Sequence, residues 1–296
     1  MNVPAASSAS DSQSQSAISF AFVQELATEM SKGPIELPSY PDVAVRVRRI
    51  LADDNVTPAK IVEVVGSEPA LAARLLRVAN SAALNSTGRA ITDMKSAVTR
   101  LGFNVIRTAA VAFAVSQVKL AQSLQGLEEP LDLLWQRSAL VAATSYVTAR
   151  NARGVNADEA MLAGLLHGVG RLYLLTRAKR HPKLFADPVA YAEVVSGWHA
   201  NIAKAILENW DMPESIVQAV HLHDDIYREN AGAADLTDVL IVGNQLATYR
   251  NRLDELETNL QLVTAVDRLR LTTSKLKAIL ETSGEQIDAL YATLGR

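Results

Sequence analysis

The sequence predicts an all-α protein, and its composition and patterning both support this fold class. The chain has 296 residues, of which 49% are apolar and only 5% are aromatic. Alanine and leucine, which favour helices, are abundant. No run of alternating apolar and polar residues bounded by turn residues indicates a strand. A chain of this length can bury one large core or two smaller ones.

Charge and cysteine content narrow the class of protein further. The formal net charge of -3 at pH 7 gives no overall attraction to nucleic acid or anionic lipid. The absence of cysteine excludes disulfides, thiolate metal sites and cysteine nucleophiles, which fits a cytoplasmic protein. The longest apolar stretch, near residues 105–118, is shorter than the ~20 residues that span a bilayer. We therefore expect neither a membrane segment nor a secretory signal.

The first third of the chain alternates helical patterns with helix-ending residues. Residues 1–17 are rich in Ser, Ala and Gln and predict a disordered tail. A helix over residues 18–30 is ended by Gly33 and Pro34, and a proline-rich connector at 37–41 leads to an amphipathic helix over 42–51. These elements open an N-terminal helical bundle that we place at residues 18–130.

Helix start and stop signals continue along the chain. Thr57 before Pro58 and Glu68 before Pro69 start two short helices. Thr92 is expected to cap a helix that Gly102 ends, before an Ala/Val-rich helix over 105–118. Further helices are predicted at 131–150, from 158, and at 191–210, 213–223, 236–249 and 274–280. These later helices predict a second bundle over residues 131–296, on which the last helices pack.

Several motifs, in their order, resemble the HDOD (HD-related output domain) family. Glu68-Pro69-Ala70-Leu71 is similar to the Asp-Pro-Ala-Leu segment of that family. The stretch from Ala163 to Arg171 is similar to the Gly-Leu-Leu-His-Asp-Ile-Gly segment that carries the HD pair, and residues 209–223 resemble the helix pair that follows. The resemblance covers residues 37–249. It implies an HDOD fold, in which an N-terminal helical bundle packs on an HD-like bundle.

The resemblance also implies that most ligands of an HD metal centre are missing. HD phosphohydrolases hold their metals through a His, an adjacent His-Asp pair and a distant Asp. The matching positions here are Arg137, His167, Gly168 and Asn244. Arginine opposes a cation, glycine has no side-chain ligand, and asparagine is a weaker, neutral ligand. We therefore predict that the chain is not an enzyme and that it has no catalytic residue and no cofactor.

Three more positions match accessory ligands of the related HD-GYP phosphodiesterases. His199 and His223 match additional histidines, and Asp224 stands where a second paired His would be. Together with His167 they form a remnant that could hold a metal if the side chains converge from different helices. Packed or solvated polar side chains are the simpler interpretation, so we predict no metal site.

The function that the resemblance implies is that of a non-catalytic bacterial signal-transduction module, which would regulate a partner protein by binding it. A groove between the bundles, or the degenerate metal pocket, would be the docking site. Two alternatives remain open. One is a divergent metal-dependent phosphohydrolase of a nucleotide or cyclic dinucleotide, and the other is a nucleic-acid-associated regulator. The sequence does not set the oligomeric state.

Two local patterns bear on nucleic-acid binding, and neither favours it. A helix-turn-helix over residues 95–109 would need a small residue where Val98 stands. The basic stretch from Arg171 to Lys183 could meet a phosphate or an acidic partner, but it is interpreted as a solvated helix end. We therefore do not expect nucleic acid as a partner.

Overall fold

The computed structural model describes residues 7–33, 47, 49–50, 53, 55–81, 84–85, 88–118, 124–177, 180–210 and 212–294, with side chains from residue 19 onward except at 115. Within these ranges the chain holds many helices and no strand, which confirms the all-α prediction. The predicted connector at 37–41, and the helix at 42–51 apart from residues 47, 49 and 50, lie outside the described residues. The helices are α1 (Ser7–Ser31), α3 (Pro58–Gly66), α4 (Pro69–Ala79), α5 (Met94–Val118), α6 (Glu128–Asn151), α7 (Ala157–Leu166), α8 (Val169–Arg177), α9 (Pro182–Phe185), α10 (Pro188–Asn209), α11 (Glu214–Leu222), α12 (Leu236–Tyr249), α13 (Leu253–Leu260), α14 (Thr264–Arg268), α15 (Thr273–Thr282) and α16 (Gly284–Leu294).

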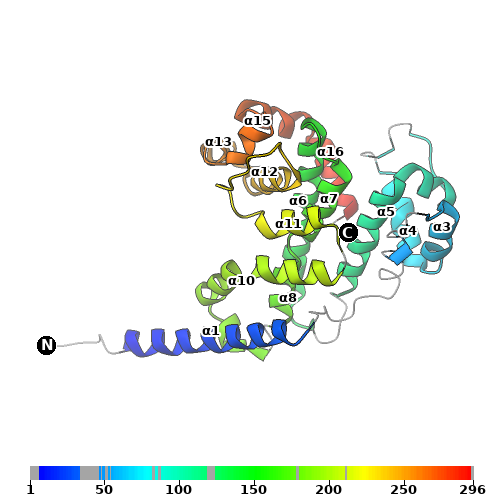
Figure 1. The fold of residues 1–296 in the computed structure, drawn as a ribbon. Helices are drawn as coiled ribbons and strands as arrows, with labels where there is room; N and C mark the ends of the chain where they lie inside the picture. Colours follow the sequence, from blue (N-terminus) through cyan, green and yellow to red (C-terminus); the bar gives the residue numbers. More distant parts are fainter. Residues whose placement is uncertain are drawn as a thin grey trace.

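The helices form two groups that meet through α5 and α16. Figure 1 shows α3, α4 and α5 together on one side, and the later helices in a larger bundle around α6. In that bundle α6 packs on α7, α12 and α16, while α5 contacts α7. The chain returns through α16, which packs on α6 and touches α4. There the Arg74 guanidinium donates to the Leu294 carbonyl at 2.6 Å. Helices α15 and α16 both contact α6.

Most of the predicted helix signals act as expected. The Thr57 hydroxyl accepts from the Lys60 amide at 3.3 Å, so it caps α3. Gly102 interrupts α5 with a φ of 71°, a left-handed backbone that glycine adopts without strain. The cap at the start of α5 is one residue later than predicted, because the Asp93 carboxylate, and not Thr92, accepts from the Ser96 amide.

The N-terminal helix differs from the prediction in its start and in its packing. Helix α1 begins at Ser7, inside the segment 1–17 that was expected to be a disordered tail. It packs on α9 and α10 of the second bundle, although residues 18–30 were assigned to the first (Figure 1). Phe22 and Leu26, each only 1% exposed, anchor it there. A helix anchored in this way extends readily through alanine and glutamine, which tolerate helical geometry.

The docking of α1 also corrects the interpretation of the basic stretch. Arg177 Nε lies 3.0 Å from Glu29 Oε2, and His181 Nε2 lies 2.8 Å from Glu25 Oε2. The Tyr173 hydroxyl donates to Glu29 as well. Burial alone would raise the pKa of Glu29, but the bonds from Tyr173 and Arg177 hold it below its usual value. These basic residues therefore meet an acidic helix of the same chain and are not a solvated helix end.

The core runs through both groups of helices. Trp135 and Trp210 are 5% and 6% exposed, and Trp198 packs on the core while partly exposed, as expected for packing residues. None of the described helices is both long enough and apolar enough to cross a membrane.

Candidate functional site

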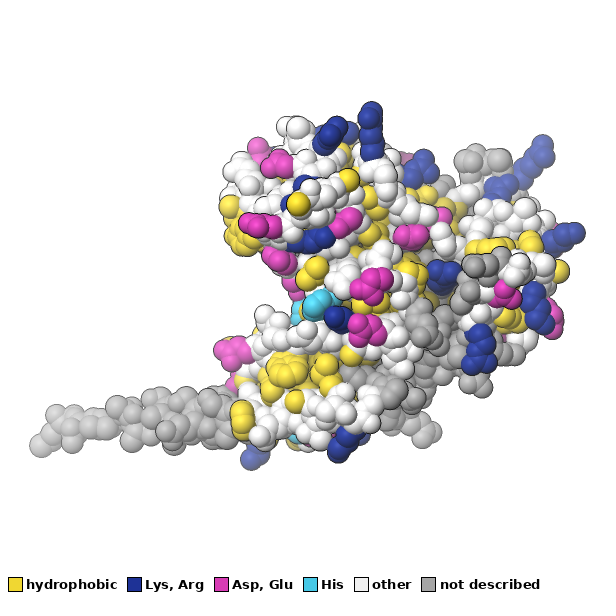
Figure 2. Space-filling view, viewed as in Figure 1, with side chains coloured by type: hydrophobic (Ala, Val, Ile, Leu, Met, Phe, Trp, Pro, Cys, Tyr) yellow, Lys and Arg dark blue, Asp and Glu magenta, His cyan; other side chains and the backbone are white. Residues whose placement is uncertain are grey.

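Three helices bring the predicted histidines together. His167 caps the C-terminus of α7, His199 lies within α10, and His223 caps the C-terminus of α11. The ring of His223 is 5.2 Å from that of His167 and 5.6 Å from that of His199, between centroids. All three residues are at most 3% exposed. Figure 2 shows histidine atoms at the inner end of the indentation between α10 and the helices above it.

A close helix crossing fixes the position of His199. The α8 backbone passes so near α10 at Gly170 that a Cβ there would lie 1.9 Å from the His199 carbonyl oxygen. Only glycine permits this approach. The start of α10 is set by Asp187, whose carboxylate accepts from the amides of Val189 and Ala190. Packing of the α10 backbone against Gly170 therefore fixes the position of His199, in addition to the contacts that its ring makes.

His167 and His223 are held in the same tautomer. The Nδ1 of His167 lies 2.6 Å from the Gly164 carbonyl, and the Nδ1 of His223 lies 2.6 Å from the Val220 carbonyl. A carbonyl oxygen only accepts, so each Nδ1 carries the proton and each Nε2 is left with a lone pair. Burial lowers the pKa of His223 to about 4 and lowers that of His167 well below its usual value. Both rings are therefore neutral near pH 7.

Asp224 supplies the negative charge of the cluster. Its Oδ2 lies 2.8 Å from His199 Nε2 and its Oδ1 lies 3.3 Å from His223 Nε2. Burial alone would raise the pKa of Asp224, but the hydrogen bond from His199 and the nearby His223 and Arg171 hold it well below its usual range. The carboxylate is ionised, so an unprotonated Nε2 of His223 faces a carboxylate oxygen. Two acceptors in contact favour a cation between them.

The cluster fits one metal ion in part. His199, His223 and Asp224 each offer a ligand atom, and these atoms lie within 4.8 Å of one another. The buried Nε2 of His223 and Nδ1 of His199 have no hydrogen-bond partner. However, the guanidinium of Arg171 lies 3.3 Å from His199 Nε2 and 3.4 Å from Asp224 Oδ2. It supplies the positive charge that an ion would bring, and a metal would have to displace it.

Arg137 occupies the place where the resemblance puts the first histidine ligand. Its Nη2 donates to the Asn244 side-chain oxygen at 2.5 Å, to the Asn244 carbonyl at 3.1 Å and to the Thr248 hydroxyl at 2.6 Å. The structure thus joins two of the positions that the sequence matched to metal ligands, 107 residues apart. Burial lowers the pKa of Arg137, and the neighbouring Arg171 lowers it further. A guanidinium held by three acceptors now ties α6 to α12.

A side chain at the Gly168 position would press against two neighbouring side chains. A Cβ there would lie 2.7 Å from Ser138 Oγ and 3.2 Å from Leu134 Cδ1. Contacts this short require Ser138 to move. An aspartate at this position, as in the HD pair, would therefore require Ser138 to shift.

Sequence reasoning missed two members of this region. Arg171 was interpreted as part of a solvated helix end, and Thr248 was not considered. Arg171 follows His167 by four residues, which is one helical turn, but the chain turns between α7 and α8, so spacing alone could not place it. Thr248 follows Asn244 by four residues within α12, and that spacing does predict a shared face.

The all-α fold and the convergence of His199, His223 and Asp224 define a class of protein, the helical proteins of HD or HDOD type. The sequence model of the HDOD domain matches residues 37–226, which is more than half of the chain. This protein belongs to the HDOD family.

Solved structures share the fold over nearly the whole chain. A proposed metal-dependent phosphohydrolase from Shewanella amazonensis SB2B is 25% identical, covers 94% of this chain and 99% of its own, and gives a TM-score of 0.76. An HDOD domain protein of unknown function from Geobacter sulfurreducens is 22% identical, with a TM-score of 0.66 over 91% of this chain and 96% of its own. A proposed signal transduction protein from Marinobacter aquaeolei VT8 is 22% identical, with a TM-score of 0.63 over 94% of this chain and 66% of its own.

One curated relative extends well beyond the matched region. An uncharacterized protein from Treponema pallidum (strain Nichols) is 22% identical over 216 residues, which are 68% of this chain and 40% of that protein. The matched region thus spans less than half the length of this relative.

Proposed function

We propose that this chain is a non-catalytic signalling module that acts by binding a partner protein. The observation that supports the absence of catalysis is the hydrogen bonding of the Arg137 guanidinium to Asn244. Metal-dependent hydrolysis needs ions that activate water and neutralise the phosphate. At two positions where such ions would find ligands, the chain has a fixed cation and a neutral amide. Gly168 adds a third position without a side-chain ligand.

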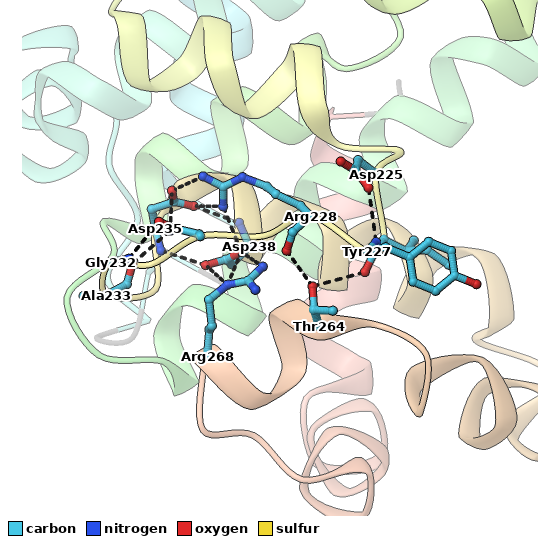
Figure 3. A network of polar contacts seen from close by, with 11 residues as sticks. Asp225, Tyr227, Arg228, Gly232, Ala233, Asp235, Asp238, Thr264 and Arg268 are labelled. Atoms are coloured by element: carbon cyan, nitrogen blue, oxygen red, sulfur yellow. Dashed lines mark hydrogen bonds and ion pairs between the residues drawn. The ribbon is translucent and has the colours of Figure 1, made fainter.

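Exposed apolar side chains support the binding of a partner protein. Tyr227 is 61% exposed and Leu262 is 51% exposed. The Thr264 amide donates to the Ile226 carbonyl at 3.0 Å, so the segments that carry the two side chains lie side by side. Figure 3 shows the Tyr227 ring directed away from the polar network next to it. Covering such side chains with a partner is favourable because it removes apolar surface from water.

A hydrolysis assay tests the non-catalytic half. The full chain would be incubated with bis(p-nitrophenyl) phosphate and with p-nitrophenyl phosphate, each with Mn²⁺, Fe²⁺, Mg²⁺ or Zn²⁺. We expect the rate to equal that of the metal without protein, and to be the same for a His167→Ala variant. A metal-dependent rate that disappears in this variant would overturn the proposal.

A crosslinking comparison tests the partner-binding half. The wild-type chain and a Tyr227→Ser, Leu262→Ser variant would be crosslinked in extract from the source cells. A Val189→Ser variant is the matched control, because Val189 is 70% exposed on α10. We expect one protein that crosslinks to the wild type and to the control but not to the double variant. Equal capture by all three would contradict docking at this surface.

A second candidate function is metal-dependent phosphohydrolysis, and the convergence of His199, His223 and Asp224 favours it. This candidate requires an ion to displace Arg171. It predicts that an Arg171→Ala variant gains metal-dependent activity. The non-catalytic proposal predicts that the same variant binds metal better and remains inactive.

A further inference from the structure

A cationic cavity is lined by residues that do not belong to the histidine cluster. It has a volume of about 550 Å³, and its walls come from the loop after α6, the loop before α12, the end of α14 and the start of α15. Arg153, Arg268, Arg270 and Lys275 line it. Among the described residues that line it there is no Asp or Glu. Most of these residues lie beyond residue 226, where the family match ends.

An ion-pair network holds one wall in place. Asp238, which is fully buried, accepts from Arg268 Nη2 at 2.6 Å and from Arg228 Nη1 at 3.0 Å. Arg228 also pairs with Asp235 at 2.6 Å. Figure 3 shows this network beside the loop of Gly232 and Ala233, which leads into the cavity wall. The network balances two cations with two carboxylates, so it fixes Arg268 without contributing net charge.

The excess positive charge comes from three other side chains. Arg153, Arg270 and Lys275 are all exposed, and among the described residues none of them forms an ion pair. Asp267, the acidic residue nearest to Arg270 in sequence, is exposed and does not line the cavity. Three unpaired cations around one concave surface attract anions, and a polyanion can contact several of them at once.

The backbone at Arg270 gives a second, independent observation. Arg270 follows the C-cap of α14, and its amide bonds to the Asp267 carbonyl while the Leu271 amide bonds to the Val266 carbonyl. This is a Schellman motif, in which glycine usually occupies the left-handed position. Arg270 has a φ of 54° and is the only non-glycine residue with a positive φ in the described part of the chain. A charged side chain stands where glycine would be less strained, and strained backbone of this kind clusters at functional positions.

We propose that this cavity binds a small molecule that carries two or more phosphate groups, held by Arg153, Arg270 and Lys275. Its volume lies within the range of small-molecule sites. Arginine recognises phosphate oxygens through paired N–H donors, and lysine adds a point charge. The inference goes beyond the proposed signalling function and does not depend on the histidine cluster, so each can fail without the other.

Isothermal titration calorimetry of the full chain with inorganic pyrophosphate tests the proposal. In a phosphate-free buffer we expect one saturable site that weakens as NaCl rises, since salt screens exposed charges. Arg270→Gly should weaken binding about tenfold, because it removes one charge-assisted contact. This variant puts glycine where the backbone favours it, so the fold is retained. Arg153→Gln combined with Lys275→Gln should weaken binding by more than Arg270→Gly.

The control is Lys60→Gln, which removes an exposed cation on α3 that pairs with the exposed Glu63. Binding by this variant should equal that of the wild type. Three results would overturn the proposal: no saturable heat with millimolar pyrophosphate, equal affinities for Arg270→Gly and the control, or binding of RNA or an acidic peptide but not of pyrophosphate.

Discussion

Replacing Gly170 by alanine tests the close crossing of α8 and α10 that positions His199. An added Cβ would lie 1.9 Å from the His199 carbonyl oxygen and 3.0 Å from the Ala203 amide nitrogen. Both neighbours are backbone atoms, so neither can rotate away and the two helices must separate. Overpacking of this kind costs about 1–3 kcal/mol, and rigid neighbours place this case at about 3 kcal/mol. We expect Gly170→Ala to lower the free energy of unfolding by that amount.

Urea unfolding followed by circular dichroism gives the measurement, and Gly197→Ala is the matched control. Gly197 lies on the same α10 helix, and a Cβ there would have no neighbour within 4 Å. Alanine in place of glycine within a helix stabilises by up to about 1 kcal/mol, so the two substitutions should have opposite signs. If Gly170→Ala were as stable as the wild type, the crossing would not hold His199 as described.

Three further predictions concern other sites. Glu29→Gln should lower stability by about 1 kcal/mol at pH 7. Because the folded-state pKa of Glu29 lies below its usual 4.5, the difference from the wild type should be full above pH 4.5 and fade as the pH falls through the folded-state value, which urea unfolding at several pH values can follow. A constant difference at all pH values would exclude the ion pair as its cause. Arg171→Ala should raise the affinity for Zn²⁺ at least about tenfold by calorimetry, because it removes a cation beside the ligands, whereas Arg171→Lys should not. Arg270→Gly should raise the free energy of unfolding by up to about 1 kcal/mol, since glycine relieves a left-handed backbone. A lower free energy of unfolding for this variant would contradict the claim that the Arg270 backbone is strained.

The fold could be predicted in outline because local signals agree with it. Thr57 before Pro58 caps a helix in sequence and in structure, and Gly102 interrupts α5 where its conformational freedom indicates a break. The docking of α1 could not be predicted in the same way. Its acidic residues meet basic partners about 150 positions later in the chain. Long-range charge pairing leaves no local pattern in either segment.

Four residues of the candidate site could be named from the sequence, but their geometry could not be predicted. The resemblance placed His167, His199, His223 and Asp224, and the structure brings them together. No sequence pattern shows that the Nδ1 atoms of His167 and His223 face carbonyl oxygens, or that Arg171 turns into the cluster. These features depend on how three helix ends meet, and the sequence constrains helix ends less than helix interiors.

The most direct test of the central claim is the metal content of the loaded protein. The claim is that Arg137, Gly168 and Asn244 abolish the core ligand set, so that the cluster can hold at most a single ion. The full chain would be incubated with excess Mn²⁺ or Fe²⁺, desalted and measured by elemental analysis beside a His167→Ala, His199→Ala variant. We predict no more than one ion per chain. Two tightly held ions per chain, lost in the variant, would contradict the claim and favour a working hydrolytic centre.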